Sequence, residues 1–225
     1  MRALPVRYQG QDQLTKMSFT LHPLQESDIE HCVTIYFSAF QNPHSLACWP
    51  RTPRIRAWWE NMIQSELHEP GAHWLKAVSN ETGAIAGFVK WQDPRPGVEP
   101  DTNLPEWPEE ADQELCNETF GAWARAHRDL MGNEGHWYLE IIATDPTYQG
   151  KGAGSLMMQY GLQKADEQGA RAFLEASPDA VRLYEKAEFL EARHLDTFIN
   201  NTRVEGTMYR NLFMIRDAIS RSDAR

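Results

Sequence analysis

The chain has 225 residues, of which 41% are hydrophobic and 24% charged, and this is enough apolar material for one sizeable globular domain. Its 22 Lys and Arg against 32 Asp and Glu give a net charge of −10 without a basic cluster, so nucleic acid is a poor match as a partner. No apolar stretch approaches the roughly 18 residues that span a bilayer, and we expect a cytoplasmic protein without a membrane partner.

The N-terminal part of the chain predicts strands and helices in a mixed order. Residues 1–16 are polar without periodicity, and we expect a flexible arm there. After a helix-start signal at Glu26–Asp28, apolar residues recur at helical spacing from Ile29 to Phe40. The other expected elements are a strand at 17–23, a loop at 41–53, a helix at 54–68, and strands at 74–78 and 84–91 joined by a turn at 80–83.

The C-terminal part begins with a predicted insertion at 93–130. Its first half, 93–108, holds five of the 13 prolines and is expected to be irregular, whereas 108–130 predicts a helix. The remaining expected elements are strands at 136–144, 171–176, 189–199 and 207–214, helices at 155–168 and 180–187, and a tail at 217–225. This order predicts a single α/β (α+β) domain over 17–216, with helices on the faces of a sheet.

Cysteine and histidine patterns favour neither disulfides nor a metal site. Cys32, Cys48 and Cys116 lie far apart and form no CxxC pair, so we expect reduced, buried thiols. The histidines are scattered and no HExxH or GxSxG motif occurs. We therefore expect a chain that uses no metal.

A glycine-rich segment is the strongest chemical motif. The sequence Gln149-Gly150-Lys151-Gly152-Ala153-Gly154 follows a β-branched strand that Asp145-Pro146 ends, and an amphipathic helix follows it directly. Glycines let several backbone N–H groups converge, and the start of the helix adds its unpaired N–H groups and positive dipole end. This is an anion site suited to a pyrophosphate. The spelling matches neither a P-loop nor a GxGxxG dinucleotide fingerprint.

Two motifs together resemble those of the GNAT acyltransferases. The stretch DPTYQGKGAGSLMMQYGLQKAD resembles the central motif of that superfamily, and FLEASPDAVRLYEKAEF resembles its next motif. Residues 137–189 are similar to the puromycin N-acetyltransferase branch and to fungal chains like it. The resemblance implies a GNAT fold, in which a mixed, mostly antiparallel sheet is splayed in a V with helices on both faces. It also implies acetyl-CoA as co-substrate and an amine as acceptor.

The acceptor itself is left open by the sequence. A small-molecule amine is the first hypothesis, because the 93–108 loop and the 108–130 helix are placed to cap the acceptor site. The alternatives are a protein or peptide N-acetyltransferase, and a GNAT-fold protein without acetyltransferase activity. We expect a monomer or a homodimer.

The resemblance assigns the coenzyme to specific residues of this chain. The pantetheine arm would pair with the strand before the glycine loop, and the pyrophosphate would lie on the loop and the first helical turn. The residues concerned are Ile142, Ala143, Thr144, Gln149, Gly150, Lys151, Gly152, Ala153, Gly154 and Ser155. Ser177 stands where an Asn often contacts the coenzyme, and we expect it to cap the last helix. Tyr184 matches the tyrosine that often protonates the departing thiolate, unless it only packs against the sheet.

Amine acylation also needs a base, because most alkyl amines are protonated at neutral pH. Glu140 is the first candidate, since an isolated carboxylate in an apolar strand is costly without a partner or a function. Two-residue periodicity places it on the same face as Ile142. Glu175 is the second candidate. Without a catalytic role, Glu140 would face water or pair with an Arg, and Glu175 would form a salt bridge in the sheet.

Two further features leave structural questions open. Glu188 stands where the second motif usually has Gly, so its turn either differs or holds a strained positive φ. Trp58 and Trp59 are adjacent on a predicted helix and cannot both face one core. One of them would line the acceptor pocket or pack against the 93–108 insertion.

Overall fold

The computed structural model describes residues 18–219. Its strands are β1 (Phe19–Pro23), β2 (Ala72–Ser79), β3 (Ile85–Gln92), β4 (His136–Thr144), β5 (Arg171–Ala176), β6 (Leu190–Ile199) and β7 (Thr207–Arg216). Its helices are α1 (Ile29–Ala39), α2 (Pro43–Cys48), α3 (Pro53–Glu66), α4 (Gln113–Met131), α5 (Ala153–Gln168) and α6 (Val181–Glu185), with 3-10 turns η1 (Glu26–Asp28) and η2 (Pro146–Tyr148). The predicted arm and most of the predicted tail lie outside the described residues, so the division of the chain into arm, domain and tail stays a prediction.

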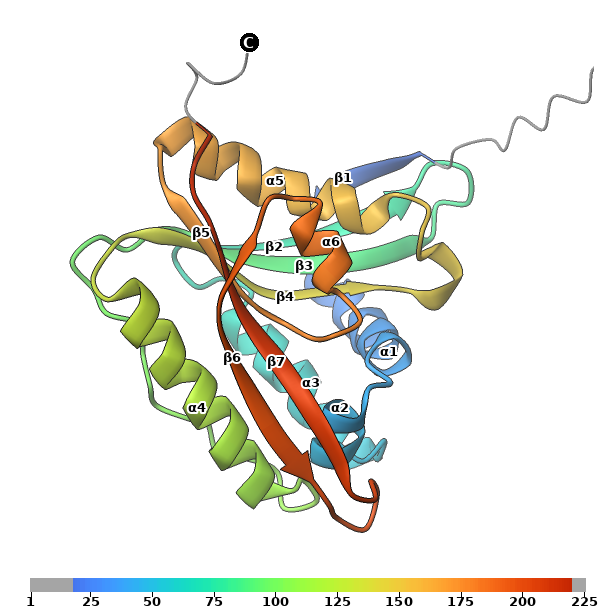
Figure 1. Ribbon diagram of the computed structural model, residues 1–225. Coiled ribbons are helices and arrows are strands. Elements are labelled where there is room, and N and C mark those ends of the chain that lie inside the picture. The colour runs from blue at the N-terminus through green and yellow to red at the C-terminus, as the bar shows by residue number, and fades with distance from the viewer. Residues whose placement is uncertain (1–17, 220–225) are drawn as a thin grey trace, which may run out of the picture.

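The seven strands form one sheet in the order β1-β2-β3-β4-β5-β7-β6. Every neighbouring pair is antiparallel except β4 and β5, which run parallel. Helices α5 and α6 lie on one side of the sheet, and α1, α2 and α3 lie on the other (Figure 1). The predicted α/β class with a mostly antiparallel sheet is confirmed.

The sheet opens between its two parallel strands. β4 and β5 pair only from His136 and Arg171 to Leu139 and Leu174. Beyond Leu139, β4 continues along β3 as far as Thr144, whereas β5 continues along β7. Figure 1 shows the β6–β7 hairpin leaving the direction of β4 at a wide angle. The predicted V is therefore present, and the last half of β4 has an unpaired edge that faces the opening.

Residues on opposite faces of the sheet enter different cores. Trp91, Trp137 and Leu174 pack under α5, so closely that a Cβ at Gly161 would lie 2.3 Å from the Trp91 indole. On the other face Trp74 and Phe88 pack with α1 and α3, and Phe173 and Phe213 pack with α4. The three cysteines are free and buried, as predicted.

Two boundaries differ from the sequence predictions because of local capping. The expected loop at 41–53 contains α2, in which Pro43 occupies the first turn and the Asn42 side chain accepts a hydrogen bond from the Ser45 N–H at 2.9 Å. Proline is favourable at that position, because the N–H it lacks would have no helical partner there. The helix expected from 108 begins at Gln113, where the Asp112 side chain accepts from the Leu115 N–H. Helix capping thus decided both boundaries.

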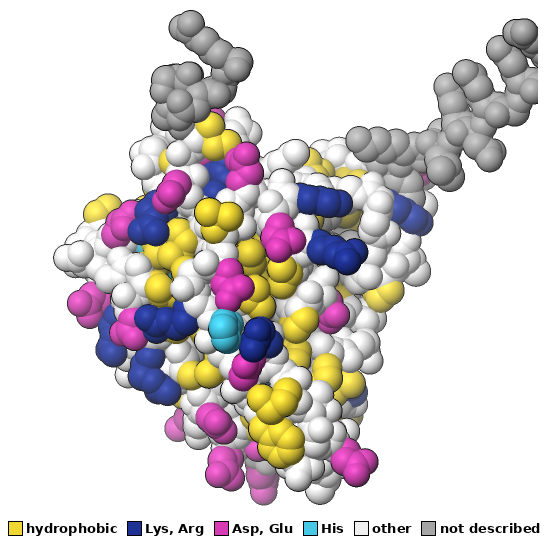
Figure 2. Space-filling model, viewed as in Figure 1, with side chains coloured by type: hydrophobic (Ala, Val, Ile, Leu, Met, Phe, Trp, Pro, Cys, Tyr) yellow, Lys and Arg dark blue, Asp and Glu magenta, His cyan; other side chains and the backbone are white. Residues whose placement is uncertain are grey.

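Two features of residues 18–219 concern the charge of the surface and the hydropathy of the helices. Acidic and basic side chains are interspersed on the face shown in Figure 2. Within 18–219, no helix is both long and apolar enough to cross a membrane.

The turn after α6 carries the strain that the sequence left open. Glu188 has a φ of 67° and is the one non-glycine residue with positive φ among those described. A side chain in this region costs about 1–2 kcal/mol, whereas glycine adopts it freely and loses somewhat more chain entropy on folding. We expect Glu188→Gly to raise the free energy of unfolding by up to about 1 kcal/mol, measured by chemical denaturation.

Glu185→Gly is the matched control for this prediction. Glu185 lies three residues earlier, as the last residue of α6, where glycine should lower the free energy of unfolding by up to about 1 kcal/mol. The exposed Glu188 side chain lies 3.8 Å from Arg216, and the loss of so loose a pair should matter little. Equal destabilisation by the two substitutions would show that the turn is not strained.

Candidate functional site

The glycine loop begins where β4 ends and is shaped by its own hydrogen bonds. The Asp145 side chain accepts from the Thr147 N–H at 2.8 Å, and the Asp145 carbonyl accepts from the Gln149 N–H at 3.1 Å. The Gln149 side chain donates back to the Thr144 carbonyl at 3.1 Å. These bonds fold the chain through η2 and return it to the start of α5, at the open end of the V.

Positive φ values then turn the backbone into the helix. Gly150 has a φ of 73° and Gly152, the residue that begins α5, has a φ of 106°. A Cβ at either position would meet no heavy atom within 4 Å, so backbone conformation rather than crowding requires glycine here. The sharp glycine turn expected from the spacing is present, while the binding of a pyrophosphate there stays a prediction.

Five backbone N–H groups of this segment have no acceptor within residues 18–219. They belong to Gly150, Gly152, Ala153, Gly154 and Ser155. The N–H groups of Gln149 and Lys151 are occupied inside the loop, the latter by the Tyr148 carbonyl at 3.3 Å. The unpaired donors and the positive end of the α5 dipole together form a site for an anion.

The unpaired edge of β4 leads directly to this cradle. Val89 pairs with Ile142 and Gly87 pairs with Thr144 on the β3 side, while the other edge faces the V. An extended chain lying in the V would therefore find backbone groups of Ile142 and Thr144 on the open edge, whereas those of Ala143, opposite Phe88, are directed to β3. The structure thus gives one continuous backbone surface from the middle of β4 into the first turn of α5.

A β-bulge places Glu140 on a different face from the one predicted. Lys90 pairs with Ile141 and Trp91 pairs with Leu139, so Glu140 is an extra residue on β4. An extra residue interrupts the two-residue alternation of a strand. Ile142 packs towards α5, whereas Glu140 contacts Lys90, whose ammonium lies 5.5 Å from the Trp74 ring in the opposite core. The expectation that Glu140 and Ile142 share a face is wrong.

Glu140 belongs to a buried ion-pair network. Lys90 is 3% exposed, and its ammonium lies 2.6 Å from Glu140 and 2.8 Å from Glu66 of α3. Burial opposes the charge of Lys90, but the two carboxylates outweigh burial and raise its pKa. Burial raises the pKa of Glu66, while Lys90 acts against that rise. The partner of Glu140 is therefore a lysine rather than the arginine considered from sequence.

Glu175 lies across the V from this network. Its carboxylate accepts a hydrogen bond from the Tyr138 hydroxyl at 2.9 Å, and it forms no salt bridge with another described residue. Burial raises the pKa of Glu175 to about 8; the Tyr138 hydrogen bond opposes this rise and the charge of Glu140 adds to it. A carboxyl with this pKa changes charge close to neutral pH, which is what acid–base chemistry requires.

Tyr184 and Ser177 occupy the segment that follows β5. Tyr184 is buried, and its ring meets Phe189 edge to face at 6.2 Å. Burial, assisted by the charge of Glu175, raises the pKa of Tyr184 well above its usual range, so it stays protonated. Ser177 accepts from the Ala180 N–H through its carbonyl, and α6 begins only after Ala180. Ser177 therefore does not cap α6 with its side chain, because a turn separates it from the helix, and its contact with the coenzyme stays a prediction.

The two adjacent tryptophans are both explained by packing. Trp58 donates its indole N–H to the Glu106 carbonyl at 3.0 Å and stacks on Trp49 at 5.3 Å. Trp59 packs on Tyr36 with ring centroids 4.1 Å apart. Of the two alternatives, packing of one tryptophan against the 93–108 insertion is confirmed, and that residue is Trp58.

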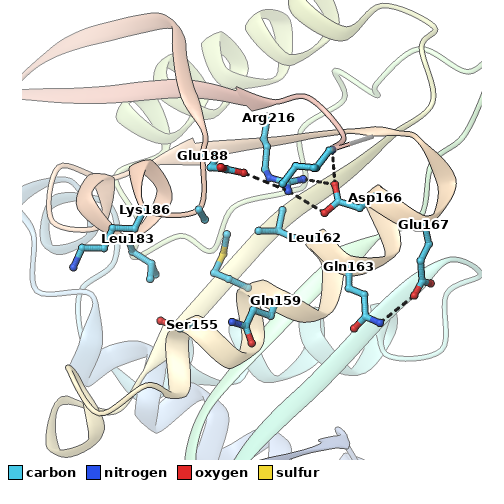
Figure 3. Close-up of a pocket in the computed structure, with 13 residues that line it drawn as sticks. Ser155, Gln159, Leu162, Gln163, Asp166, Glu167, Leu183, Lys186, Glu188 and Arg216 are labelled. Carbon is cyan, nitrogen blue, oxygen red and sulfur yellow. Dashed lines mark hydrogen bonds and ion pairs between the residues drawn. The ribbon is translucent and has the colours of Figure 1, made fainter. Parts of the chain in front are cut away.

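A groove of about 700 Å³ extends away from the glycine loop between α5 and α6. Figure 3 shows Ser155 at one end, Leu183 and Lys186 along the α6 wall, and Asp166 with Arg216 at the far end. The Arg216 guanidinium is buried and donates to both oxygens of Asp166, at 2.8 and 3.0 Å. The groove therefore joins the anion cradle to a longer, mostly apolar surface.

Sequence reasoning missed Lys90, Glu66 and Tyr138. Lys90 carried a usable signal, because it is a lone charge inside the apolar strand IAGFVKWQ, as Glu140 is in its own strand. Glu66 and Tyr138 carried none, since an acidic residue at a helix end and a tyrosine in a strand are ordinary features.

A sequence model of the acetyltransferase (GNAT) family matches residues 30–189, which include the V, the glycine loop and α6. The chain belongs to this family. This confirms the resemblance at the level of the superfamily, and it makes the protein an acetyltransferase-family chain whose acceptor the match does not specify.

Solved structures of known acetyltransferases share the fold. A Corynebacterium glutamicum protein described as histone acetyltransferase HPA2 and related acetyltransferase has 23% identity and a TM-score of 0.58, over 90% of this chain and 98% of that one. The ribosomal-protein-S18-alanine N-acetyltransferase of Escherichia coli has 17% identity and a TM-score of 0.54, over 90% and 96%. A mosquito arylalkylamine N-acetyltransferase like 5b has 16% identity and a TM-score of 0.64, over 89% and 100%. Their names cover protein and small-amine acceptors, so likeness of fold alone does not choose between them.

Proposed function

We propose that this GNAT chain transfers the acetyl group of acetyl-CoA to the amine of a small molecule. The observation that carries the proposal is the continuous backbone surface formed by the open edge of β4 and the five unpaired N–H groups at the start of α5. A pantetheine arm needs an extended partner in the V, and a pyrophosphate needs converging donors, and the two lie end to end. The spelling of residues 137–189 favours the puromycin N-acetyltransferase branch within the family.

The chain's own residues suit the coenzyme. Ile142 and Thr144 would hold the pantetheine arm, and Gly150 with Gly152–Ser155 would hold the pyrophosphate. The groove that opens at Ser155 would receive the nucleotide half. When bound, acetyl-CoA supplies an acetyl group activated as a thioester.

Two carboxylates are candidates for taking the proton of the amine. Glu140 lies on the bulge of β4, 34% exposed and held by Lys90, so it has a fixed position beside the V. Glu175 has a pKa of about 8 and faces the same space from β5. We propose Glu140 as the base, because its contact with Lys90 fixes the direction of its carboxylate beside the V, and Glu175 as the alternative.

Tyr184 is proposed to protonate the departing thiolate, and Tyr184→Phe tests this role. The hydroxyl has no hydrogen-bond partner among the described residues, whereas the ring packs on Phe189. We expect kcat to fall about 10²-fold with little change in affinity for acetyl-CoA, because the ring is kept and the acid is lost. Steady-state kinetics and melting temperature would check it. A variant with full turnover would leave Tyr184 a packing residue.

Tertiary contacts hold the two segments that we place beside the acceptor site, and this supports a small acceptor. The 93–112 segment is fastened to α3 and α4 through Trp58 and through the Trp107 indole, which donates to Asn117 at 2.8 Å. The turn after β6 is fastened to α2 by Arg203, which donates twice to the Ala47 carbonyl, at 3.0 and 2.6 Å. An extended protein tail would have to displace these contacts, whereas a small amine would not.

Release of the coenzyme A thiol tests the whole proposal. The purified chain would be given acetyl-CoA with a panel of small amines and, separately, peptides with a free N-terminus or lysine. We expect turnover with at least one small amine and little with peptides. Turnover confined to peptides would favour the protein acetyltransferase, and tight acetyl-CoA binding without turnover would favour a GNAT-fold binding protein.

A further inference from the structure

Lys90 is the most deeply buried charged side chain beside the V. It lies on β3, between strands β2 and β4, and only 3% of its surface is exposed. Its ammonium contacts the carboxylates of Glu140 and Glu66 at 2.6 and 2.8 Å and lies 5.5 Å from the Trp74 ring. Burying a lysine costs free energy unless its charge is matched, and here two carboxylates match it.

The groups that face this lysine form an acidic cluster with one cation. Glu66 comes from α3, Glu140 and Tyr138 from β4, and Glu175 from β5, while Glu69, three residues after the end of α3, acts on Glu66 from further away. The charge of Glu140 raises the pKa of both Glu66 and Glu175. Glu140 therefore makes ionisation of both neighbouring carboxyls harder, and Lys90 is the one ammonium among these groups.

We propose that Lys90 is a positioning residue that fixes the Glu140 carboxylate on its bulge beside a positive charge, so that one carboxylate oxygen is directed to take a proton from the acceptor amine. The proposal rests on the proposed function, with Glu140 as base. The proton moves from the protonated amine nitrogen to a Glu140 carboxylate oxygen, and the neutral amine keeps the electron pair with which it attacks the acetyl carbonyl. Lys90 retains its own proton throughout.

The contacts of Glu140 support a division in which Lys90 holds one carboxylate oxygen and the other oxygen accepts the proton. Lys90 contacts Oε2 of Glu140, which leaves Oε1 for the substrate. An extra residue on a bulge is not held by ladder pairing, so a side-chain partner is what fixes its direction. Glu66 competes with Glu140 for the same ammonium and should therefore weaken the effect of Lys90 on Glu140.

Two substitutions should move the pH dependence of the reaction in opposite directions. In Lys90→Met the nearest cation is lost, protonation of Glu140 becomes easier, and the acid limb of the kcat/KM profile should move up by about 1–3 pH units. In Glu66→Gln a competing negative charge is lost, and the same limb should move down. Lys90→Arg keeps a positive charge at this position, so its acid limb should lie closer to that of the wild type than the limb of Lys90→Met does. If Lys90 had only a structural role, Lys90→Met and Glu66→Gln would not shift the acid limb in opposite directions.

Lys76→Met is the matched control. Lys76 lies on β2 and forms a similarly buried pair with Asp28 at 2.5 Å, outside the group of charges that faces Glu140. The Lys76→Met variant should be less stable than the wild type, but the acid limb of its kcat/KM profile should not move. If Lys90→Met fails to fold, Glu66→Gln decides the matter, because Glu66 is partly exposed and the substitution keeps its shape.

Carbon-13 NMR of the glutamate carboxyls in the protein without substrate gives a readout independent of turnover, with Glu140→Gln identifying the signal. We expect the Glu140 titration midpoint to rise in Lys90→Met and to fall in Glu66→Gln. The proposal would be overturned if neither the Glu140 titration midpoint nor the acid limb of the kcat/KM profile moved in either variant. If the wild-type chain turned over no amine, the proposed function would fail, and the NMR titration alone would decide the role of Lys90.

Discussion

A Gly152→Val substitution is expected to weaken the binding of acetyl-CoA by about 10²–10⁴-fold, because two or more charge-assisted hydrogen bonds would be lost. Gly152 has a φ of 106°, which a β-branched residue adopts only with strain. The loop would relax to a negative φ and turn the N–H groups of Gly152 to Ser155 away from a common point. Isothermal titration with acetyl-CoA and with coenzyme A would measure the loss.

Gly169→Val separates this effect from general instability. Gly169 ends α5 with a φ of 63°, and a Cβ there meets nothing within 4 Å, so the local strain is of the same kind. It lies at the opposite end of the helix from the cradle. We expect similar destabilisation with unchanged affinity for acetyl-CoA. Normal affinity in Gly152→Val would place the pyrophosphate elsewhere.

The parts of the site that are made of backbone could be predicted from the sequence. The bounds 136–144 and 171–176 of the strands beside the V agree with the structure, because apolar β-branched runs end there at strong turn signals. The glycine spacing predicted the loop, since positive φ leaves a direct mark on residue choice. Glu188 was informative for the same reason, as its departure from Gly indicated a strained turn that the structure contains.

The parts that depend on side chains from distant elements could not be predicted. The bulge at Glu140 arises from how β4 pairs with β3, and a strand's own sequence does not record an extra residue in its register. As a result, simple alternation placed Glu140 on the wrong face. Lys90 was visible as an isolated charge, but its partners come from α3 and β4, which only the folded chain brings together.

Glu140→Gln is expected to lower kcat/KM at neutral pH by about 10²–10⁴-fold, because the substitution keeps the size of the side chain and removes its basicity. Affinity for acetyl-CoA should stay unchanged, since the cradle lies at the other end of the V. The remaining activity should rise with pH more steeply than in the wild type, as neutral amine replaces the missing base. Initial rates from about pH 6 to 10 would measure this. A near-normal profile would rule out Glu140 as the base.

Glu175→Gln should behave differently, because the pKa of about 8 leaves Glu175 mostly protonated at pH 7 and glutamine resembles that form. With Glu140 as base, the neutral-pH rate should change little; with Glu175 as base, it should fall sharply and lose its rise through pH 8.

The pH dependence of stability gives an independent check on the pKa of Glu175. The folded-state pKa lies above the ordinary glutamate pKa of 4.5, so the stability that Glu175 contributes is present at acid pH and is lost as pH rises from about 4.5 through 8. Glu175→Gln lacks this loss, and its melting temperature relative to wild type should increase across that window. A constant difference would show that folding does not raise the pKa of Glu175, and the rate of Glu175→Gln would then decide between the two carboxylates.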